Sequence, residues 1–531
     1  MQAERVFLNG RIYTMDTTSP QAQAMAVRCG RVMAVGDNAE IEALAGWDTE
    51  KVDLHGRTAL PGFIDSHLHL VWLALSLQQV RLDDVATLQQ AVGAVAERAR
   101  TAKPGEWIRG RGWNRNLWPG ARFPHKRDLD SVVPNNPVFL PAKDGHSAWV
   151  NSLALQLAGI TAQTPDPPGG QLERDPQTGE LTGVLKEGPA MALVARAAGE
   201  PCLDDKAQGI RAAVARLHRQ GVVGVHSSEE ETDLAALQAV WRRGELNLRV
   251  SVLITERWLE HARKMGLRAG LGDPEGLRVF AIKVFADGAL GSRTADMLEP
   301  YDDEPGNRGI AVTDSARLEQ LVADCVAGGW NMAIHAIGDR ANRRVLDALE
   351  LQRDAWVARG LRMRIEHAQL LAPEDLLRVG RLGVIASMQP IHCTSDRDMA
   401  ERHWRNRCGG AYAWRSMLDG GAVLAFGSDA PVEEPDVLRG IHAAVTRQRE
   451  DGTPAGGWHP EQALTVHEAV HAYTVGAAYA SGDERSRGSL TPGKLADMVV
   501  LSQDIMRLPP QELLKTHVEQ TVLGGRVVHS L

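Results

Sequence analysis

The chain of 531 residues is too long for one ordinary domain, although a barrel of alternating strands and helices with insertions can take most of such a length. Its net charge of −8 and pI of about 6.2 argue against nucleic acid or an anionic membrane as the partner, so we expect a small-molecule partner. No apolar run approaches the roughly 18 residues of a membrane span, and the first residues lack a secretory pattern, which predicts a cytoplasmic protein.

Short segments rich in valine and isoleucine stand near both ends of the chain. They are residues 4–14, 23–35 and 50–54 at the beginning, and 496–502 and 518–530 at the end. Turn pairs such as Asn9-Gly10 and Gly524-Gly525 predict antiparallel hairpins. Because isolated strands would leave exposed edges, we expect residues 1–58 and 480–531 to pair into one small β-sandwich; two unrelated terminal arms are the alternative.

Strands and helices alternate between these ends. The expected strands are 60–66, 137–141, 221–226, 248–254, 277–285, 331–335, 362–367, 383–388 and 422–428, and expected helices between them include 88–102, 205–220, 313–328, 340–358 and 373–381. This alternation predicts an α/β protein with a parallel sheet closed into a (β/α)₈ TIM barrel over residues 59–479. Eight strands remain for the barrel if an insertion after its first strand, at about 71–210, carries the strand at 137–141.

The first barrel strand ends in two histidines, His67 and His69. Residues i and i+2 of a strand share a face, so both imidazoles can point at one metal ion, although such a pair also arises by chance. Further polar residues lie at the ends of other expected barrel strands: Lys283 on the fourth, His335 on the fifth, His367 on the sixth and Asp429 on the eighth. Reactive groups of a TIM barrel gather at the carboxyl ends of its strands. The pattern therefore predicts a converging metal site.

Long motifs of the chain resemble the amidohydrolase superfamily, and specifically its YtcJ-like branch, which includes N-substituted formamide deformylases. The motifs are LPGFIDSHLHL (60–70), DGHSAWVNSLAL (144–155), TGVLKE (182–187), IKVFADGALGSRTA (282–295), MAIHAIGDRA (332–341), RIEHAQ (364–369), SMQPIH (387–392), AYAWRSMLDGG (411–421), FGSDAPVE (426–433) and GSLTPGKLADMVVLS (488–502). The resemblance covers nearly the whole chain and implies a metal-dependent hydrolase whose barrel adjoins a β-sandwich built from both termini.

The resemblance also implies a ligand set for one or two divalent ions, with Zn²⁺ as the expected metal. His67, His69 and Asp429 would bind one ion, and His335 and His367 a second. Lys283 would bridge the two as an N-carboxylated lysine, because an ordinary ammonium has no lone pair to offer a cation. A mononuclear site without this bridge is the alternative.

The expected reaction is hydrolysis of a non-peptide C–N bond in an amide, formamide or cyclic amide by metal-activated hydroxide, with Asp429 as general base and then general acid. Contacts to the substrate or its oxyanion are expected from residues in family-like motifs: His146, His226, Arg293 and His392. The alternatives are deamination of a heterocycle and a noncatalytic binding or regulatory protein on the same barrel. Assembly into a homo-oligomer is compatible with the sequence.

Overall fold

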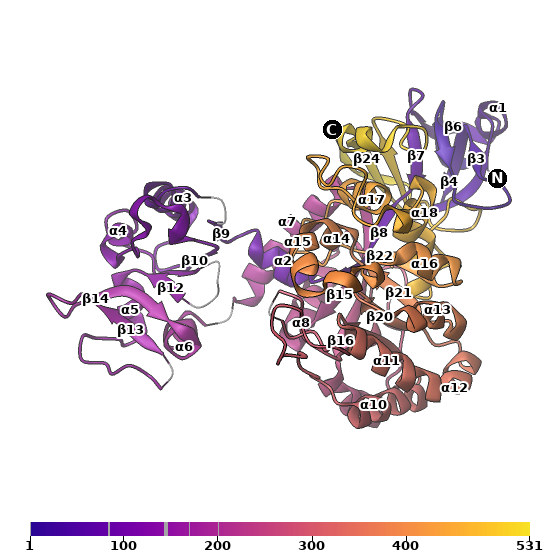
Figure 1. Cartoon of the computed structure of the whole chain (residues 1–531). Helices are drawn as coiled ribbons and strands as arrows, with labels where there is room; N and C mark the ends of the chain where they lie inside the picture. Colours follow the sequence, from indigo (N-terminus) through magenta and orange to yellow (C-terminus); the bar gives the residue numbers. More distant parts are fainter. Residues whose placement is uncertain (1, 83–84, 143–146, 169, 200, 292) are drawn as a thin grey trace. The chain divides into compact units, whose positions relative to one another are not determined.

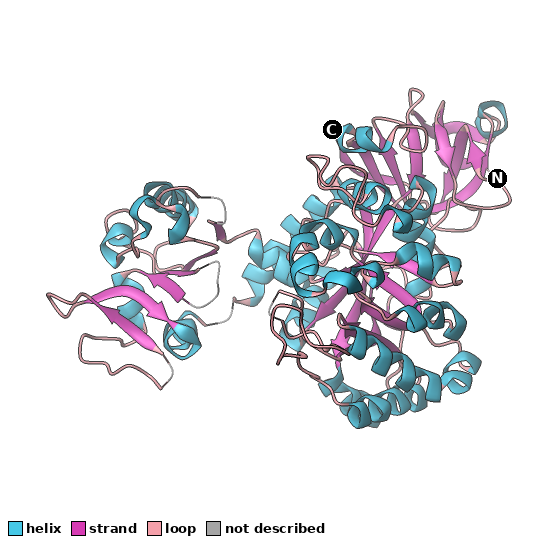
Figure 2. Cartoon of the chain, in the orientation of Figure 1, coloured by secondary structure: helices cyan, strands magenta, loops and turns pink. Residues whose placement is uncertain are grey.

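The computed structural model describes residues 2–82, 85–142, 147–168, 170–199, 201–291 and 293–531. The chain forms two compact units (Figure 1): one combines residues Met1–Leu73 with Ile210–Leu531, and the other spans Ala74–Gly209. In the first unit, strands of one sheet are surrounded by helices (Figure 2). Among the described residues, no helix has both the length and the apolar character needed to cross a membrane.

Eight parallel strands form the central sheet of the first unit. In spatial order they are β8 (Phe63–Leu68), β15 (Val222–Glu229), β16 (Arg249–Thr255), β18 (Leu277–Phe285), β19 (Asn331–Ala336), β20 (Met363–His367), β21 (Ile385–Met388) and β22 (Val423–Phe426). The short β17 (Leu271–Gly272) pairs antiparallel with β18. These strands are the eight predicted for the barrel, so the predicted TIM-barrel fold is confirmed.

The first and last barrel strands meet through the turn that follows β22. The amide of Asp429 donates a 2.7 Å hydrogen bond to the carbonyl of His67, and the amide of His69 donates one of 2.9 Å to the carbonyl of Ala430. Backbone hydrogen bonds between these two segments bring residues from both ends of the strand order to one edge. The barrel is nearly closed at this edge, beside the expected metal ligands.

One or more helices follow each strand of the barrel along the chain. They are α2 (Leu70–Ser76), α7 (Leu203–Arg219), α8 (Glu231–Arg242), α9 (Leu259–Lys264), α10 (Ser315–Gly328), α11 (Asp339–Leu351), α12 (Arg353–Ala358), α13 (Pro373–Leu382), α14 (Pro390–Ser395), α15 (Arg397–His403), α16 (Trp414–Asp419), α17 (Val437–Thr446), α18 (Val466–His471) and α19 (Ala477–Ala480). Helix α10 shows why such segments are helical. The Asp314 carboxylate caps its first turn by accepting from the amide of Arg317, and Gly329 ends it in the left-handed conformation.

Both termini contribute to two further sheets. One sheet has the order β5 (Arg31–Gly36), β4 (Ala24–Arg28), β1 (Ala3–Leu8), β6 (Ala45–Asp53), and the other has the order β25 (Arg526–Ser530), β24 (Val518–Leu523), β23 (Met498–Leu501), β7 (Thr58–Pro61), β2 (Arg11–Tyr13), β3 (Gln21–Ala22). Phe7 and Met25 of the first sheet share one buried core with Ile12, Met498 and Val522 of the second. The helix α1 (Asn38–Glu42) lies between β5 and β6 in the chain. The predicted β-sandwich built from both ends is therefore confirmed.

One predicted hairpin is wrong. Strands β1 and β2, on either side of Asn9-Gly10, lie in different sheets, because β1 pairs with β4 and β6 whereas β2 pairs with β3 and β7. The turn carries the chain from one layer of the sandwich to the other, which buries Phe7 and Ile12 in the same core. The hairpin at Gly524-Gly525, between β24 and β25, is as predicted.

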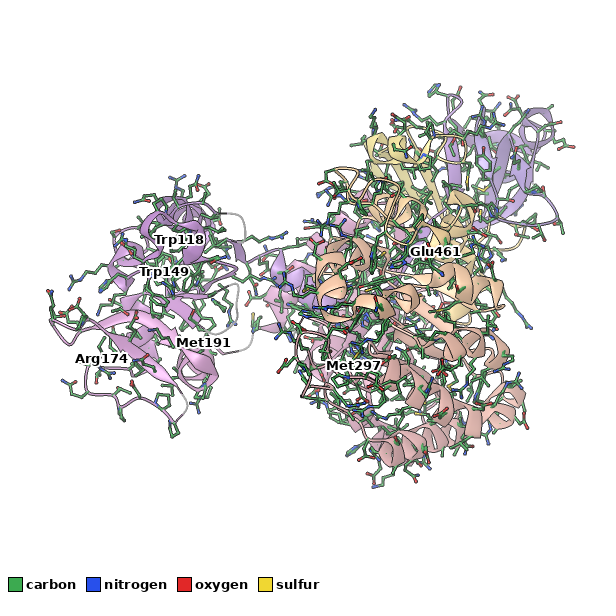
Figure 3. The ribbon with its side chains drawn as sticks, viewed as in Figure 1. Trp118, Trp149, Arg174, Met191, Met297 and Glu461 are labelled. Atoms are coloured by element: carbon green, nitrogen blue, oxygen red, sulfur yellow. The ribbon has the colours of Figure 1, made fainter. Side chains whose placement is uncertain are left out.

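The second unit has its own sheet, in the order β13 (Gln171–Arg174), β14 (Leu181–Lys186), β12 (Ser147–Val150), β11 (Val138–Pro141), β10 (Ile108–Arg111), β9 (Val80–Arg81). Its helices are α3 (Leu88–Thr101), α4 (Lys126–Asp130), α5 (Ser152–Leu157) and α6 (Glu187–Ala198). Buried tryptophans fill its core: the rings of Trp118 and Trp149 lie 6.4 Å apart (Figure 3). The predicted insertion carries the expected strand, while the domain boundaries at residues 58 and 480 remain predictions.

Candidate metal centre

The histidines and the aspartate of the predicted ligand set lie at the carboxyl ends of barrel strands. His67, His367 and Asp429 each present one donor atom within 4.8 Å of the other two. The Nε2 atoms of His67 and His69 both lie 3.4 Å from Asp429 Oδ1. The His335 ring lies 4.6 Å from the His367 ring, centroid to centroid. The structure thus brings the imidazoles from three strands to one carboxylate and to each other.

Each of the four imidazoles has one ring nitrogen facing an acceptor. For three of them this nitrogen is Nδ1: His67 lies 2.5 Å from Glu366 Oε2, His69 lies 3.2 Å from the Ser228 carbonyl, and His367 lies 2.8 Å from Gln389 Oε1. For His335 it is Nε2, which lies 2.8 Å from the Gly288 carbonyl. A ring nitrogen that donates to an acceptor leaves the other nitrogen as a lone-pair donor, which is how metal-binding histidines are held. The side chains present therefore fit a divalent metal ion.

The charge states of these groups also suit a cation. Burial lowers the pKa of His335 to about 4 and that of His367 well below its ordinary value, so both rings are neutral. Burial acts to raise the pKa of Asp429, but the imidazoles of His392, His67 and His69 beside it outweigh that effect and hold the pKa well below its ordinary value. The site thus offers neutral imidazoles and an ionised carboxylate, the ligand types that Zn²⁺ accepts.

Lys283 stands on β18, and its side chain is buried. Burial lowers its pKa to about 8, against the opposite influence of Glu366 and Asp429. The Nζ atom lies 5.1 Å from the centroid of the Phe285 ring. A lysine amine with a pKa near neutrality is partly unprotonated, which is the form that can react with an electrophile.

Two of these residues adopt backbone conformations that are rare for residues with side chains. His367 has φ of 72° and Asp429 has φ of 60°, both in the left-handed region. Such conformations cost of the order of 1–3 kcal/mol each and persist where the surroundings impose them, often at functional sites. The neighbouring Gly427 is required by close packing, since a Cβ there would lie 2.4 Å from the amide nitrogen of His67.

Asp65 links the two segments that meet at this edge of the barrel. Its carboxylate accepts hydrogen bonds from the amide of His67 (3.1 Å), the amide of Ser428 (3.0 Å) and the hydroxyl of Ser428 (2.6 Å). Burial raises the pKa of Asp65 to about 6, against these hydrogen bonds. Sequence reasoning gave Asp65 no role, because its partner Ser428 is remote in the chain.

The residues expected to contact substrate have different surroundings. His392 Nε2 lies 3.4 Å from Asp429 Oδ2, at the site itself. His226 is buried, and its Nδ1 lies 2.8 Å from an Nη1 atom of Arg364. Arg293 forms ion pairs with Asp303 (3.0 Å) and Glu304 (3.5 Å). His146 lies outside the described residues.

Two further carboxylates beside the candidate ligands have no place in the sequence prediction. Glu366 contacts His67, as described above. Asp287 accepts from the amides of Asp296 (2.9 Å), Ile337 (3.0 Å) and Gly338 (2.8 Å), and lies 3.5 Å from His335 Nε2. A signal for Glu366 exists in the sequence, since Arg364 and Glu366 are two residues apart in a strand and so point to the same face.

Known proteins are similar to this chain in sequence and in fold. The model of an amidohydrolase family matches residues 50–529. The putative amidohydrolase YtcJ of Bacillus subtilis is 32% identical over 99% of both chains, and the N-substituted formamide deformylase of Arthrobacter pascens is 29% identical over 98% of this chain and 97% of its own. A crystal structure of an uncharacterized metal-dependent hydrolase from Pyrococcus furiosus superposes with a TM-score of 0.79, at 29% identity, over 95% of this chain and all of that one. The chain therefore belongs to the amidohydrolase family of metal-dependent hydrolases, in the branch that includes YtcJ.

Proposed function

We propose that this enzyme hydrolyses a non-peptide C–N bond in an amide, formamide or cyclic amide, using Zn²⁺ held by His67, His69, His335, His367 and Asp429. The observation that carries the proposal is the convergence of His67, His367 and Asp429 within 4.8 Å. The similarity to a formamide deformylase over nearly the whole chain supports a substrate of this class. When bound, the metal supplies Lewis acidity: it lowers the pKa of a water molecule and polarises a carbonyl group.

Asp429 would carry out the proton transfers at this centre. Asp429 would take the proton of the attacking water on a carboxylate oxygen and later give it to the departing amine. His392 is placed to assist, because its Nε2 lies 3.4 Å from Asp429 Oδ2. Burial acts to lower the pKa of His392, but Asp429 outweighs it and raises that pKa to about 9, so this ring is a cation beside the carboxylate. A cationic ring there can also donate to the oxyanion that forms from the carbonyl.

Lys283 would serve as a bridging ligand once its amine has been carboxylated by CO₂. Its lowered pKa and its burial at the end of β18 support this role, since carboxylation requires the unprotonated amine. With the bridge, the site would hold two ions; without it, His335 and His367 would serve a mononuclear centre or the substrate. We further predict that the substrate is a small molecule. Assembly into a homo-oligomer stays a prediction.

The test is a panel of N-substituted formamides, simple amides, cyclic amides and amino-heterocycles, assayed with and without a chelator. Release of an amine from the amide substrates, abolished by the chelator and restored by Zn²⁺, is the expected result. Release of ammonia from the heterocycles alone would favour a deaminase. Chelator-resistant amide hydrolysis would contradict the metal-dependent mechanism.

A further inference from the structure

A buried ion pair lies directly beneath the candidate metal centre. Glu366 and Arg364 are both on β20, and the side chains of both are fully buried. Arg364 donates from Nε to one carboxylate oxygen of Glu366, and from Nη2 to the other at 3.0 Å. Two parallel hydrogen bonds of this kind fix the orientation of a carboxylate as well as neutralising it.

The Glu366 carboxylate also contacts His67, a candidate metal ligand. Glu366 Oε2 lies 2.5 Å from His67 Nδ1, while the other nitrogen of that ring lies 3.4 Å from Asp429. This close contact with a carboxylate favours the His67 tautomer that carries its proton on Nδ1 and directs the lone pair of Nε2 toward Asp429. A carboxylate in this position also makes the imidazole a stronger donor to a cation.

The two terminal nitrogens of Arg364 have further partners. Its Nη1 lies 2.8 Å from His226 Nδ1, and Nη2 donates at 2.9 Å to the hydroxyl of Ser387 and also to the carbonyl of Ser66. Burial lowers the pKa of His226 well below its ordinary value, so its Nδ1 can accept from the guanidinium. A buried charge is tolerated where its hydrogen bonds are completed, and here the partners come from four strands of the barrel.

We propose that Glu366 is a positioning residue for the metal ligand His67, and that Arg364 holds Glu366 in place with His226 as its buried acceptor. The inference rests on the proposed function, since it concerns the metal centre, and it gives Glu366, Arg364 and His226 a role in metal affinity. His226 then acts through Arg364, from inside the barrel.

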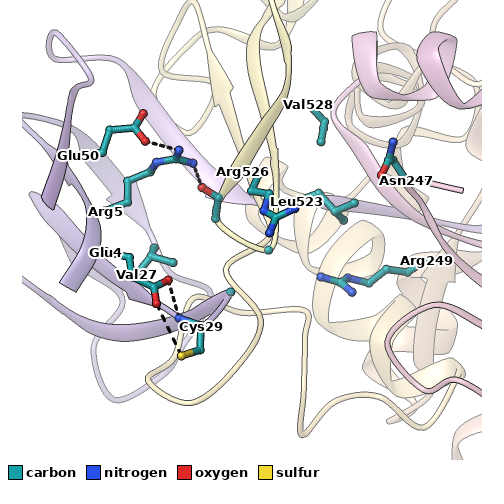
Figure 4. A pocket seen from close by; sticks show the side chains of 13 residues that line it. Glu4, Arg5, Val27, Cys29, Glu50, Asn247, Arg249, Leu523, Arg526 and Val528 are labelled. Atoms are coloured by element: carbon teal, nitrogen blue, oxygen red, sulfur yellow. Dashed lines mark hydrogen bonds and ion pairs between the residues drawn. The ribbon is translucent and has the colours of Figure 1, made fainter. Parts of the chain in front are cut away.

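A matched ion pair between the barrel and the sandwich provides the control. Arg249 donates to Asp497 from Nε at 2.6 Å and from Nη2 at 2.8 Å, and both side chains are buried. Arg249 begins β16, so it lies at the amino-terminal face of the barrel, opposite the strand ends that carry the ligands. It borders a hollow of about 720 Å³ between the sandwich and the barrel (Figure 4). Breaking this pair therefore removes a buried ion pair comparable to that of Arg364 and Glu366, at the face of the barrel opposite the candidate metal centre.

The test is the Zn²⁺ dissociation constant of the full chain, measured by competition with a chromogenic chelator for Glu366→Gln, Glu366→Asp and Asp497→Asn. Glu366→Gln removes the charge, whereas Glu366→Asp keeps the charge for Arg364 but withdraws the carboxylate from His67. We expect both Glu366 variants to weaken Zn²⁺ binding about 10–100-fold, the usual effect of losing such a partner, and Asp497→Asn to leave it unchanged. The visible spectrum of the Co²⁺-loaded protein should shift only in the Glu366 variants.

If Glu366→Gln does not fold, the Zn²⁺ dissociation constant of Glu366→Asp alone tests the inference. A folded Glu366→Asp variant with the wild-type dissociation constant would overturn the inference, and so would an equal weakening in Asp497→Asn. A wild-type chain that binds no Zn²⁺ would overturn the proposed function and this inference together, whereas wild-type binding with unchanged Glu366 variants overturns the inference alone.

Discussion

The hydroxyl of Ser428 donates a 2.6 Å hydrogen bond to the carboxylate of Asp65, and this bond joins the turn that presents Asp429 to the strand that presents His67. The two segments meet where the barrel is nearly closed, beside the candidate metal ligands. Replacing either partner should therefore disturb the geometry of the site as well as the stability of the barrel.

The first prediction concerns Ser428→Ala. Loss of a hydrogen bond to a buried carboxylate should lower the stability of the first unit by about 1.5–3 kcal/mol. We also expect a lower kcat, because Asp429 follows directly in the chain. Thermal unfolding and steady-state kinetics measure the two effects. Ser131→Ala, at an exposed serine of the other unit, is the control; equal behaviour of the two variants would refute a special role for Ser428.

The second prediction concerns Asp429→Asn. The amide cannot accept the proton of an attacking water, so turnover should fall by about 10²–10⁴-fold while the circular dichroism spectrum is retained. Metal content should stay near that of the wild type, since an amide oxygen can still bind a cation. Asp504→Asn is the matched control, since the Asp504 carboxylate accepts from Arg11 and Tyr13 of β2 in the sandwich. An Asp429→Asn variant with wild-type kcat would exclude this residue as the base.

The third prediction concerns Lys283→Ala. If a carboxylated lysine bridges two ions, removing the amine should reduce the bound metal by about one ion per chain. Plasma mass spectrometry on protein prepared without chelator gives this number directly. Unchanged metal content would instead support the mononuclear site, with Lys283 as a buried amine near the substrate.

The fourth prediction uses the pH dependence of stability at Glu229, a buried carboxyl at the end of β15 that accepts from the amide of Val71. Burial raises the pKa of Glu229 to about 8, above its ordinary value of 4.5. The folded chain then binds a proton that the unfolded chain has lost, so this group contributes less stability as pH rises from 4.5 to 8. The Glu229→Gln variant has no ionisable group at this position, so its stability lacks this dependence on pH.

We therefore expect Glu229→Gln to gain stability relative to the wild type as the pH is raised from 5 to 8, with little further change above that range. Thermal unfolding of both proteins across this range measures the difference. A stability difference that is independent of pH would show that Glu229 is ionised in the folded chain.

The barrel and the converging strand ends were predictable because local signals specify them. Runs of valine and isoleucine mark buried parallel strands, and the residues that follow each run must meet at one face of the barrel. His67 and His69 could be placed at that face from the sequence alone. The prediction of a hairpin at Asn9-Gly10 was wrong because the same turn residues also occur where the chain crosses from one sheet to another. Only the packing of Phe7 and Ile12 into one core distinguishes the crossing from a hairpin.

The residues that support the ligands depend on partners from distant parts of the chain. Glu366 gains its role from His67, and Asp65 gains its role from Ser428, pairs separated by about 300 residues or more. Arg293 shows the converse, because acidic residues ten and eleven positions further along the same loop form ion pairs with it. The contacts of Glu366 with His67 and of Asp65 with Ser428 join distant segments, and spacing in a single sequence does not reveal them.

The central claim is that His67, His367 and Asp429 hold a metal ion. The most direct test is the Zn²⁺ content per chain of the wild type and of the double variant His67→Ala/His367→Ala, each loaded with Zn²⁺ and freed of excess metal. We predict one or two ions per wild-type chain, and a double variant that is folded and has lost the ion together with its hydrolytic activity. A wild-type chain without bound metal, or a double variant with the same metal content as the wild type, would contradict the claim.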